Sequence, residues 1–68
     1  MKLSARNVFA GKVVKVTEGS VNTEVTLDVG GVKIVSIITR ESAKTLKLKK
    51  GVKAYAVVKA SEVLIGVD

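Results

Sequence analysis

Valine, isoleucine and leucine recur in short runs along this chain, and glycines separate the runs. Runs rich in β-branched residues and bounded by turn formers predict strands. The first run covers residues 7–19, and Gly11 in its middle predicts a bulge or a sharp bend. The second run covers residues 21–30, where apolar and polar residues alternate from Val25 onward. Such alternation is typical of a strand with one buried face.

Two adjacent glycines, Gly30 and Gly31, predict a hairpin turn between the second run and a third run at residues 32–39. Two further strand-like runs cover residues 52–60 and residues 62–67. The last three runs each contain a stretch that is apolar on both faces, such as Ile-Val-Ser-Ile-Ile. The pattern therefore predicts five strands.

The segment between the third and fourth runs is the only helical candidate. Thr39 can cap its N-terminus, Glu41 lies in its first turn, and lysines gather at its end before Gly51. We expect a helix of about two turns. Its inward-facing residues are predicted to be Ala43, Leu46 and Leu48.

Five strands with a short helix between the third and the fourth give the element order of an OB-type barrel. A long, bent first strand also fits this fold. The sequence therefore predicts an all-β protein, a five-stranded OB-type barrel with one short helix between strands 3 and 4. A partly open sandwich or an SH3-like barrel is the alternative.

With 68 residues, the chain predicts a single domain over residues 1–68. A domain of this size is only marginally stable alone. The absence of cysteine and histidine excludes disulfides, the commonest zinc sites, and catalysis by Ser-His or Cys-His pairs. Runs that are apolar on both faces need a second cover, because a lone barrel buries only its inner face. We expect a homo-oligomer, although scattered exposed valines would also fit the pattern.

The charge balance is basic, with 12 Lys and Arg against 6 Asp and Glu and a net charge of +6. Such a balance favours an anionic partner, unless the lysines only keep the surface soluble. The apolar runs are too short to cross a bilayer, and the first residues lack the apolar core of a secretory signal. The expected location is the cytoplasm.

Hydrogen-bond donors concentrate in three short stretches that end or interrupt apolar strands. They are Ser4, Arg6 and Asn7 near the start, Ser20 and Asn22 in a Gly-Ser turn, and Lys59, Ala60 and Ser61 at a strand junction. A tetrahedral oxyanion carries only acceptor oxygens, so its site should present cations, hydroxyls and backbone N–H groups. Each stretch could also be structural: a local turn, a surface charge, or a lysine at a strand end.

Five ordered motifs make the chain resemble a molbindin, the small Mop-type molybdate-binding domain. They are SARN at the start, EGSVNTEV after the first strand, ITRES after the third, LKLKKG before the fourth and YAVVKASEV near the end. The resemblance implies an OB-type barrel assembled as a hexamer, a trimer of dimers. It also implies binding of molybdate or tungstate at subunit interfaces, for intracellular storage or buffering. One departure is Lys47, where the family often has glycine.

The resemblance also assigns residues to two kinds of oxyanion site. The first site would use Ser4, Ala5, Arg6, Thr39, Lys59, Ala60 and Ser61, with the last three supplied by a neighbouring subunit. The second would lie near a three-fold axis and use Gly19, Ser20, Val21 and Asn22. The family implies molybdate as the ligand, with no further cofactor and no protein side chain bound directly to the metal.

The main alternative is an OB-type protein that binds single-stranded nucleic acid, because such barrels often do so and the chain is basic. Stacking platforms need aromatic residues, and only Phe9 and Tyr55 are present. We therefore expect no nucleic-acid partner and no membrane partner. No acid–base pair is visible among the scattered carboxylates, so the chain is predicted not to be an enzyme.

Overall fold

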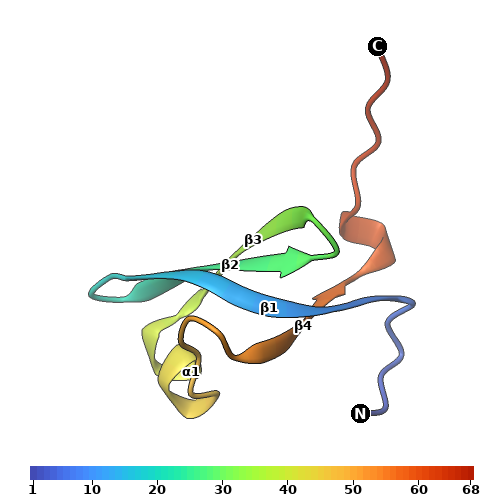
Figure 1. Ribbon diagram of the computed structural model, residues 1–68. Coiled ribbons are helices and arrows are strands. Elements are labelled where there is room, and N and C mark those ends of the chain that lie inside the picture. The colour runs from blue at the N-terminus through green and yellow to red at the C-terminus, as the bar shows by residue number, and fades with distance from the viewer.

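A computed structural model describes all 68 residues and shows one antiparallel sheet in the order β3-β2-β1-β4 (Figure 1). The strands are β1 (Asn7–Glu18), β2 (Asn22–Val29), β3 (Val32–Thr39) and β4 (Lys53–Val58). The helix α1 (Arg40–Thr45) joins β3 to β4, and a 3-10 turn, η1 (Ala60–Glu62), follows β4. No helix is long and apolar enough to cross a membrane.

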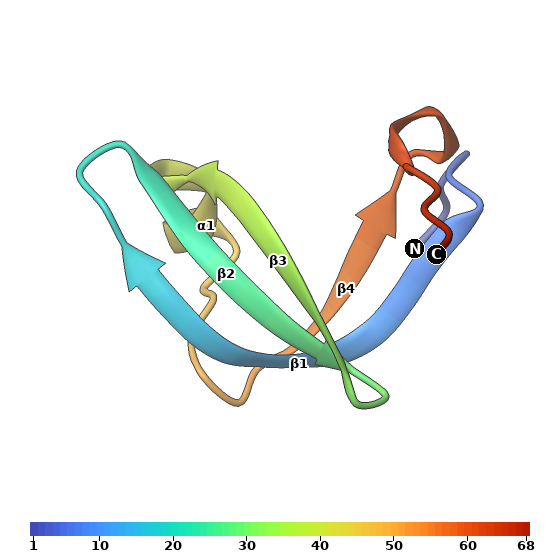
Figure 2. The same cartoon turned by 90° about the horizontal axis from the view of Figure 1, so that it is seen from above.

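β1 is the strand that gives the sheet its shape. Its first half pairs with β4 from Asn7 to Lys12, and its second half pairs with β2 from Lys12 to Glu18. The register shifts by one residue between Val13 and Lys15, which marks a β-bulge. Figure 2 shows that β1 curves along its whole length, so the sheet curls into half a barrel.

Of the two alternatives predicted at Gly11, a bulge or a sharp bend, the bulge does not form there, because the irregularity lies two to four residues further on, between Val13 and Lys15. The structure shows a different reason why glycine is needed at position 11. A Cβ at position 11 would overlap the Asp28 carbonyl oxygen of β2 and approach Val29 Cγ1 to 2.6 Å. The curl brings the two strands so close that only glycine fits.

The core is small, and only six residues are buried. Its centre is formed by Val13, Val25, Leu27 and Ala56. In β2 the buried face includes Thr23, which is 1% exposed. The alternation of buried and exposed residues therefore begins at Thr23, two residues before Val25, where the sequence pattern placed its start. A core of this size leaves much apolar surface uncovered, as on β3, where Ile37 is 68% exposed.

The short helix begins as predicted, since the Thr39 side chain accepts a hydrogen bond from the Ser42 N–H. Ala43 is buried and Leu48 packs against the core, as expected. Leu46 is 62% exposed, so its predicted inward position is wrong. The helix ends at Thr45, and the chain reverses at once, which turns Leu46 outward.

The reversal is a Schellman motif centred on Lys47, whose φ is +55°. The Lys47 N–H donates to the Lys44 carbonyl at 3.0 Å, and the Leu48 N–H donates to the Ala43 carbonyl at 3.1 Å. Glycine is the usual residue at this position because it has no Cβ to clash. Here the motif forms with lysine in the left-handed conformation.

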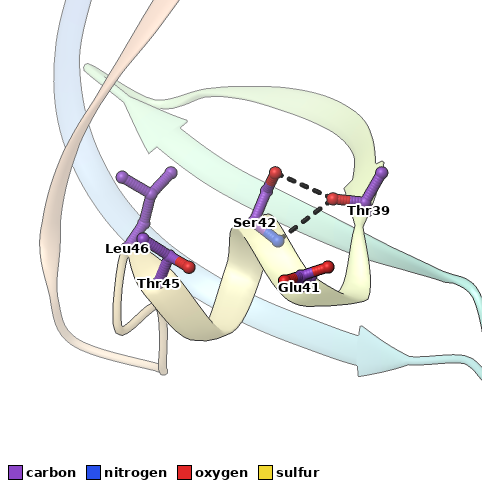
Figure 3. A pocket seen from close by; sticks show the side chains of 5 residues that line it. All are labelled: Thr39, Glu41, Ser42, Thr45 and Leu46. Carbon is purple, nitrogen blue, oxygen red and sulfur yellow. Dashed lines mark hydrogen bonds between the residues drawn. The ribbon is translucent and has the colours of Figure 1, made fainter.

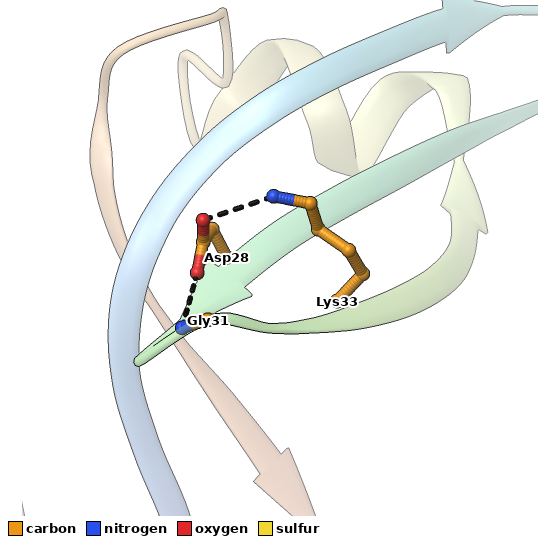
Figure 4. Close-up of polar contacts among 3 residues, drawn as sticks. All are labelled: Asp28, Gly31 and Lys33. Carbon is orange, nitrogen blue, oxygen red and sulfur yellow. Dashed lines mark hydrogen bonds and ion pairs between the residues drawn. The ribbon is translucent and has the colours of Figure 1, made fainter.

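The predicted hairpin at Gly30 and Gly31 is confirmed, with φ values of +65° and +91° that fit a type I′ turn. Asp28 braces the turn (Figure 4). Its carboxylate accepts a hydrogen bond from the Gly31 N–H at 2.8 Å and an ion-pair contact from Lys33 Nζ at 2.9 Å.

The fifth strand predicted over residues 62–67 is not formed. Residues up to Glu62 make the 3-10 turn, and the remaining residues extend away from the sheet (Figure 1). Leu64 and Ile65 are 93% and 87% exposed. A strand needs an edge to pair with, and this tail does not reach an edge of its own sheet. The single chain is thus a four-stranded, curled half-barrel with one short helix.

Candidate functional site

Two of the predicted donor stretches leave the same end of the β1–β4 ladder. Asn7, the first residue of β1, pairs with Val58, the last residue of β4. The stretch of residues 4–6 precedes this pair and the stretch of residues 59–61 follows it. Figure 1 shows the N-terminal segment and η1 departing from this end in opposite directions. The two stretches therefore begin together and then diverge within one chain.

The side chains in these two stretches are open to solvent. Ser4, Arg6, Lys59 and Ser61 are exposed, whereas Ala5 is half-buried and Ala60 is exposed. Neither Arg6 nor Lys59 takes part in an ion pair, since the only two in the chain are Lys33–Asp28 and Arg40–Glu18. Both cations are therefore free to meet an anion.

The third donor stretch is the turn between β1 and β2. The Gly19 N–H donates to the Asn22 carbonyl at 2.8 Å, and the Arg40 N–H donates to the Val21 carbonyl at 2.8 Å. These bonds fix the turn against the start of α1. Ser20, Val21 and Asn22 remain exposed, with Val21 at 72%.

Thr39 lies beside this turn, because the β2–β3 register pairs it with Asn22. It lines a surface pocket of about 390 Å³ together with Glu41, Ser42, Thr45 and Leu46 (Figure 3). The Thr39 hydroxyl donates to Ser42 Oγ at 2.8 Å. To reach an oxyanion it would have to exchange this bond, and the Glu41 carboxylate at the same pocket repels anions.

The seven residues predicted for the first site are thus split between the two ends of β1. β1 has 12 residues and crosses much of a molecule whose longest extent is 35 Å (Figure 2), so its two ends lie farther apart than a tetrahedral oxyanion can bridge. Thr39 stands at the Glu18 end, and the other six stand at the Asn7 end. One chain alone does not bring them together.

Asp28, whose pKa is shifted, lies outside these stretches. The Lys33 ammonium and then the Gly31 N–H stabilise the Asp28 carboxylate, and they hold the pKa of Asp28 below its ordinary value. This group serves the hairpin. The chain has no cluster of three or more His, Cys, Asp or Glu side chains that could hold a metal ion.

A second pocket, of about 260 Å³, escaped the sequence analysis. Its polar lining comprises Glu18, Thr23, Arg40, Lys44 and Lys47. The lysines look like ordinary helix-surface charges in the sequence. In β2 every second residue is buried, and extending this alternation back from Val25 would have predicted that Thr23 is buried too. That was the only sequence signal for a buried polar residue next to these lysines.

Comparisons with known proteins place this fold among molybdenum-handling proteins. Residues 3–65 match the family model described as the TOBE domain. A probable molybdenum-pterin-binding protein of Haemophilus influenzae is 45% identical over 69 aligned positions, which cover 100% of both chains.

Solved structures agree in fold. An apo form of MopII from Clostridium pasteurianum superposes with a TM-score of 0.92 at 45% identity, covering 97% of this chain and 100% of that one. A molybdate-bound structure of the cytoplasmic molybdate-binding protein ModG gives a TM-score of 0.95 at 48% identity. That comparison covers all of this chain and 49% of ModG.

Proposed function

The chain belongs to the TOBE-domain family and, within it, to the Mop-type molybdate-binding proteins, and from this premise we propose that it binds molybdate, or tungstate as a mimic, at interfaces between its own subunits. The role is storage or buffering of the oxyanion in the cytoplasm, without catalysis. Residues 1–68 act as one Mop-type domain. The observation that carries the proposal is the similarity over the whole chain to molybdate-binding relatives.

The donor set suits the proposed ligand. Molybdate is a tetrahedral dianion with four acceptor oxygens and no proton to donate. Arg6 and Lys59 would supply charge, while hydroxyls and the backbone would supply directed hydrogen bonds. The first site would combine Ser4, Ala5, Arg6 and Thr39 with Lys59, Ala60 and Ser61. The second would use the turn formed by Gly19, Ser20, Val21 and Asn22.

The need for more than one subunit follows from the split described above. Because Thr39 lies at the far end of β1 from Arg6 and Lys59, a site that uses all three needs a second chain. An interface would also bury these exposed donors and exclude water, which strengthens each bond to the anion.

The exposed apolar surface supports the same assembly, which we propose to be a hexamer arranged as a trimer of dimers. Leu64 and Ile65 on the free tail are almost fully exposed, and β3 and β4 each present an unpaired edge. Adding residues 62–67 of one chain to a sheet edge of another would supply the missing fifth strand and complete an OB-type barrel.

Native mass spectrometry tests the function directly. We expect a hexamer that gains mass in molybdate-sized steps when molybdate is added and gains none with sulfate at the same concentration. A monomer that ignores molybdate would contradict the proposal. Oligonucleotide binding would then be the next function to test, although only two aromatic residues are available for stacking.

The variant Arg6→Ala tests the first site. It removes a charge-assisted hydrogen bond and should weaken molybdate binding by about 1.5–3 kcal/mol. Lys49→Ala is the matched control, because Lys49 is also an exposed cation but lies outside the donor stretches. Equal affinities of both variants and the parent protein, measured by calorimetry, would remove Arg6 from the site.

A further inference from the structure

The second pocket lies within one chain, between α1 and the end of the hairpin formed by β1 and β2. Glu18 and Thr23, which pair across the two strands, form one side. Arg40, Lys44 and Lys47 approach from the helix and its C-terminal turn. Three apolar side chains complete the lining, so the pocket is partly apolar.

Thr23 is the unusual member of this lining. It is 1% exposed, and its hydroxyl has no hydrogen-bond partner in the chain. A buried hydroxyl without a partner is unfavourable, because it has lost its hydrogen bonds to water. Thr23 lines the pocket, so a small movement of its side chain would bring this covered hydroxyl into contact with a molecule held there.

The charge of the pocket favours an anion. Glu18 Oε1 contacts Arg40 Nε at 2.8 Å, which uses one face of the guanidinium and neutralises one positive charge. Neither Lys44 nor Lys47 has a carboxylate within ion-pair distance. Two uncompensated ammonium groups thus border a pocket whose lining includes Thr23, the residue with the unpaired hydroxyl.

Lys47 adds a second, independent observation. It holds φ = +55° at a position where glycine would be free of strain, and the two Schellman hydrogen bonds form without any need for its side chain. Residues held in unfavourable backbone conformations concentrate at functional sites. The side chain gained at this cost lines the pocket.

We propose that this pocket binds a small tetrahedral dianion, with the Thr23 hydroxyl and the Lys44 and Lys47 ammonium groups as its donors and Arg40 as a further positive charge. The ligand would be inorganic phosphate or a second molybdate, which share this shape and charge. The site is distinct from both interface sites, because all of its residues come from one chain. It gives each subunit its own anion site.

Titration of the ¹⁵N-labelled protein with phosphate, at constant ionic strength balanced with chloride, tests the proposal. We expect the NMR signals of the Thr23 and Leu48 amides to shift and to reach saturation below about 10 mM anion. A titration over this range detects even a dissociation constant in the millimolar range. A parallel titration with molybdate in an Arg6→Ala/Ser20→Ala background tells the two ligands apart, since these substitutions weaken both interface sites. No saturable shift with either anion would overturn the proposal.

Variants separate a real site from general charge screening. Lys44→Gln and Lys47→Gly should each weaken binding at least about fivefold. Lys49→Gln makes the same change of charge outside the pocket and should leave the affinity unchanged within about twofold. Equal losses in all three variants would overturn the site.

The melting temperature measured without anion is a second readout, because the substitutions that weaken binding should raise it. Lys47→Gly relieves the backbone strain and Thr23→Val removes the unpartnered hydroxyl, so both should raise the melting temperature while they weaken phosphate binding. If both variants melt higher but bind phosphate as tightly as the parent protein, the hydroxyl and the lysine are not ligands.

Discussion

At the scale of single residues, Asp28 shows how one side chain fixes a turn. Its two carboxylate oxygens serve different partners, the Gly31 N–H and the Lys33 ammonium. Both partners favour the ionised form, so the pKa of Asp28 in the folded protein lies below its ordinary value of 3.8. The hairpin between β2 and β3 therefore gains stability from a charge that acid removes.

Replacing Asp28 by asparagine should lower stability near neutral pH, because the amide keeps an acceptor for Gly31 but loses the charge that Lys33 contacts. Since the folded-state pKa is depressed, this contribution is fully present above pH 3.8 and is lost as the pH falls through the folded value. Urea unfolding across this range should therefore show the gap between the parent protein and Asp28→Asn closing in acid.

Glu24→Gln is the matched control for this experiment, because Glu24 lies exposed on the same strand and forms no ion pair. It should show a smaller difference at neutral pH. A gap for Asp28→Asn that stays constant down to the lowest pH would contradict the assigned role of the carboxylate.

At the scale of the elements, β1 determines the curvature of the sheet because it pairs with β4 along one half and β2 along the other. The bulge between Val13 and Lys15 and the close approach at Gly11 both lie near the change of partner. The strand can bend there because one position has no side chain.

Gly11→Ala should destabilise the protein by about 1–3 kcal/mol, the usual cost of forcing extra atoms into a packed site. The obstacle is the backbone carbonyl of Asp28, which cannot rotate aside as a side chain would. Chemical denaturation measures the effect. Gly66→Ala is a suitable comparison, since a Cβ there meets nothing within 4 Å in the chain. Equal stability of the two variants would show that β1 and β2 can separate without cost.

At the scale of the whole molecule, the core has only six buried residues, and the apolar tail of the single chain is exposed. Burying a large aliphatic side chain contributes about 1.5–3 kcal/mol. Leu64 and Ile65 together are therefore a substantial source of association energy, provided that a partner covers them.

Replacing both Leu64 and Ile65 by serine should shift the protein toward smaller assemblies in size-exclusion chromatography with light scattering. The fold of the half-barrel should survive, because neither side chain contacts the core cluster. Leu46→Ser removes a similar exposed aliphatic side chain at the end of α1, outside both edge strands, and serves as the control. An unchanged mass for the tail variant would exclude the tail from the interface.

The features that the sequence predicted correctly depend on local chemistry. The paired glycines fix the hairpin, and Thr39 with Ser42 fixes the start of the helix, because both need only neighbouring residues. The failures depend on distant partners. Leu46 follows a helical pattern but lies beyond the helix end, and residues 62–67 have strand composition but no edge to join.

The site shows the same division. Sequence motifs identify donor residues, but the register of the sheet decides which of them can meet. Thr39 pairs with Asn22, and that single pairing separates it from Arg6 by the length of β1. Thr23 went unnoticed because a threonine interrupts the apolar pattern that would have marked its position as buried.

The separation of Thr39 and Arg6 along β1 has a consequence for mixtures of variants. If each site takes donors from different chains, as proposed, two weakly binding variants can repair one another. Refolding Arg6→Ala together with Thr39→Ala would produce some interfaces in which both substitutions fall in the same site, leaving other sites fully normal. Some sites in the mixture would then bind molybdate with the affinity of the parent protein, although each variant alone binds it only weakly. A protein whose sites lay within single chains would show no such complementation.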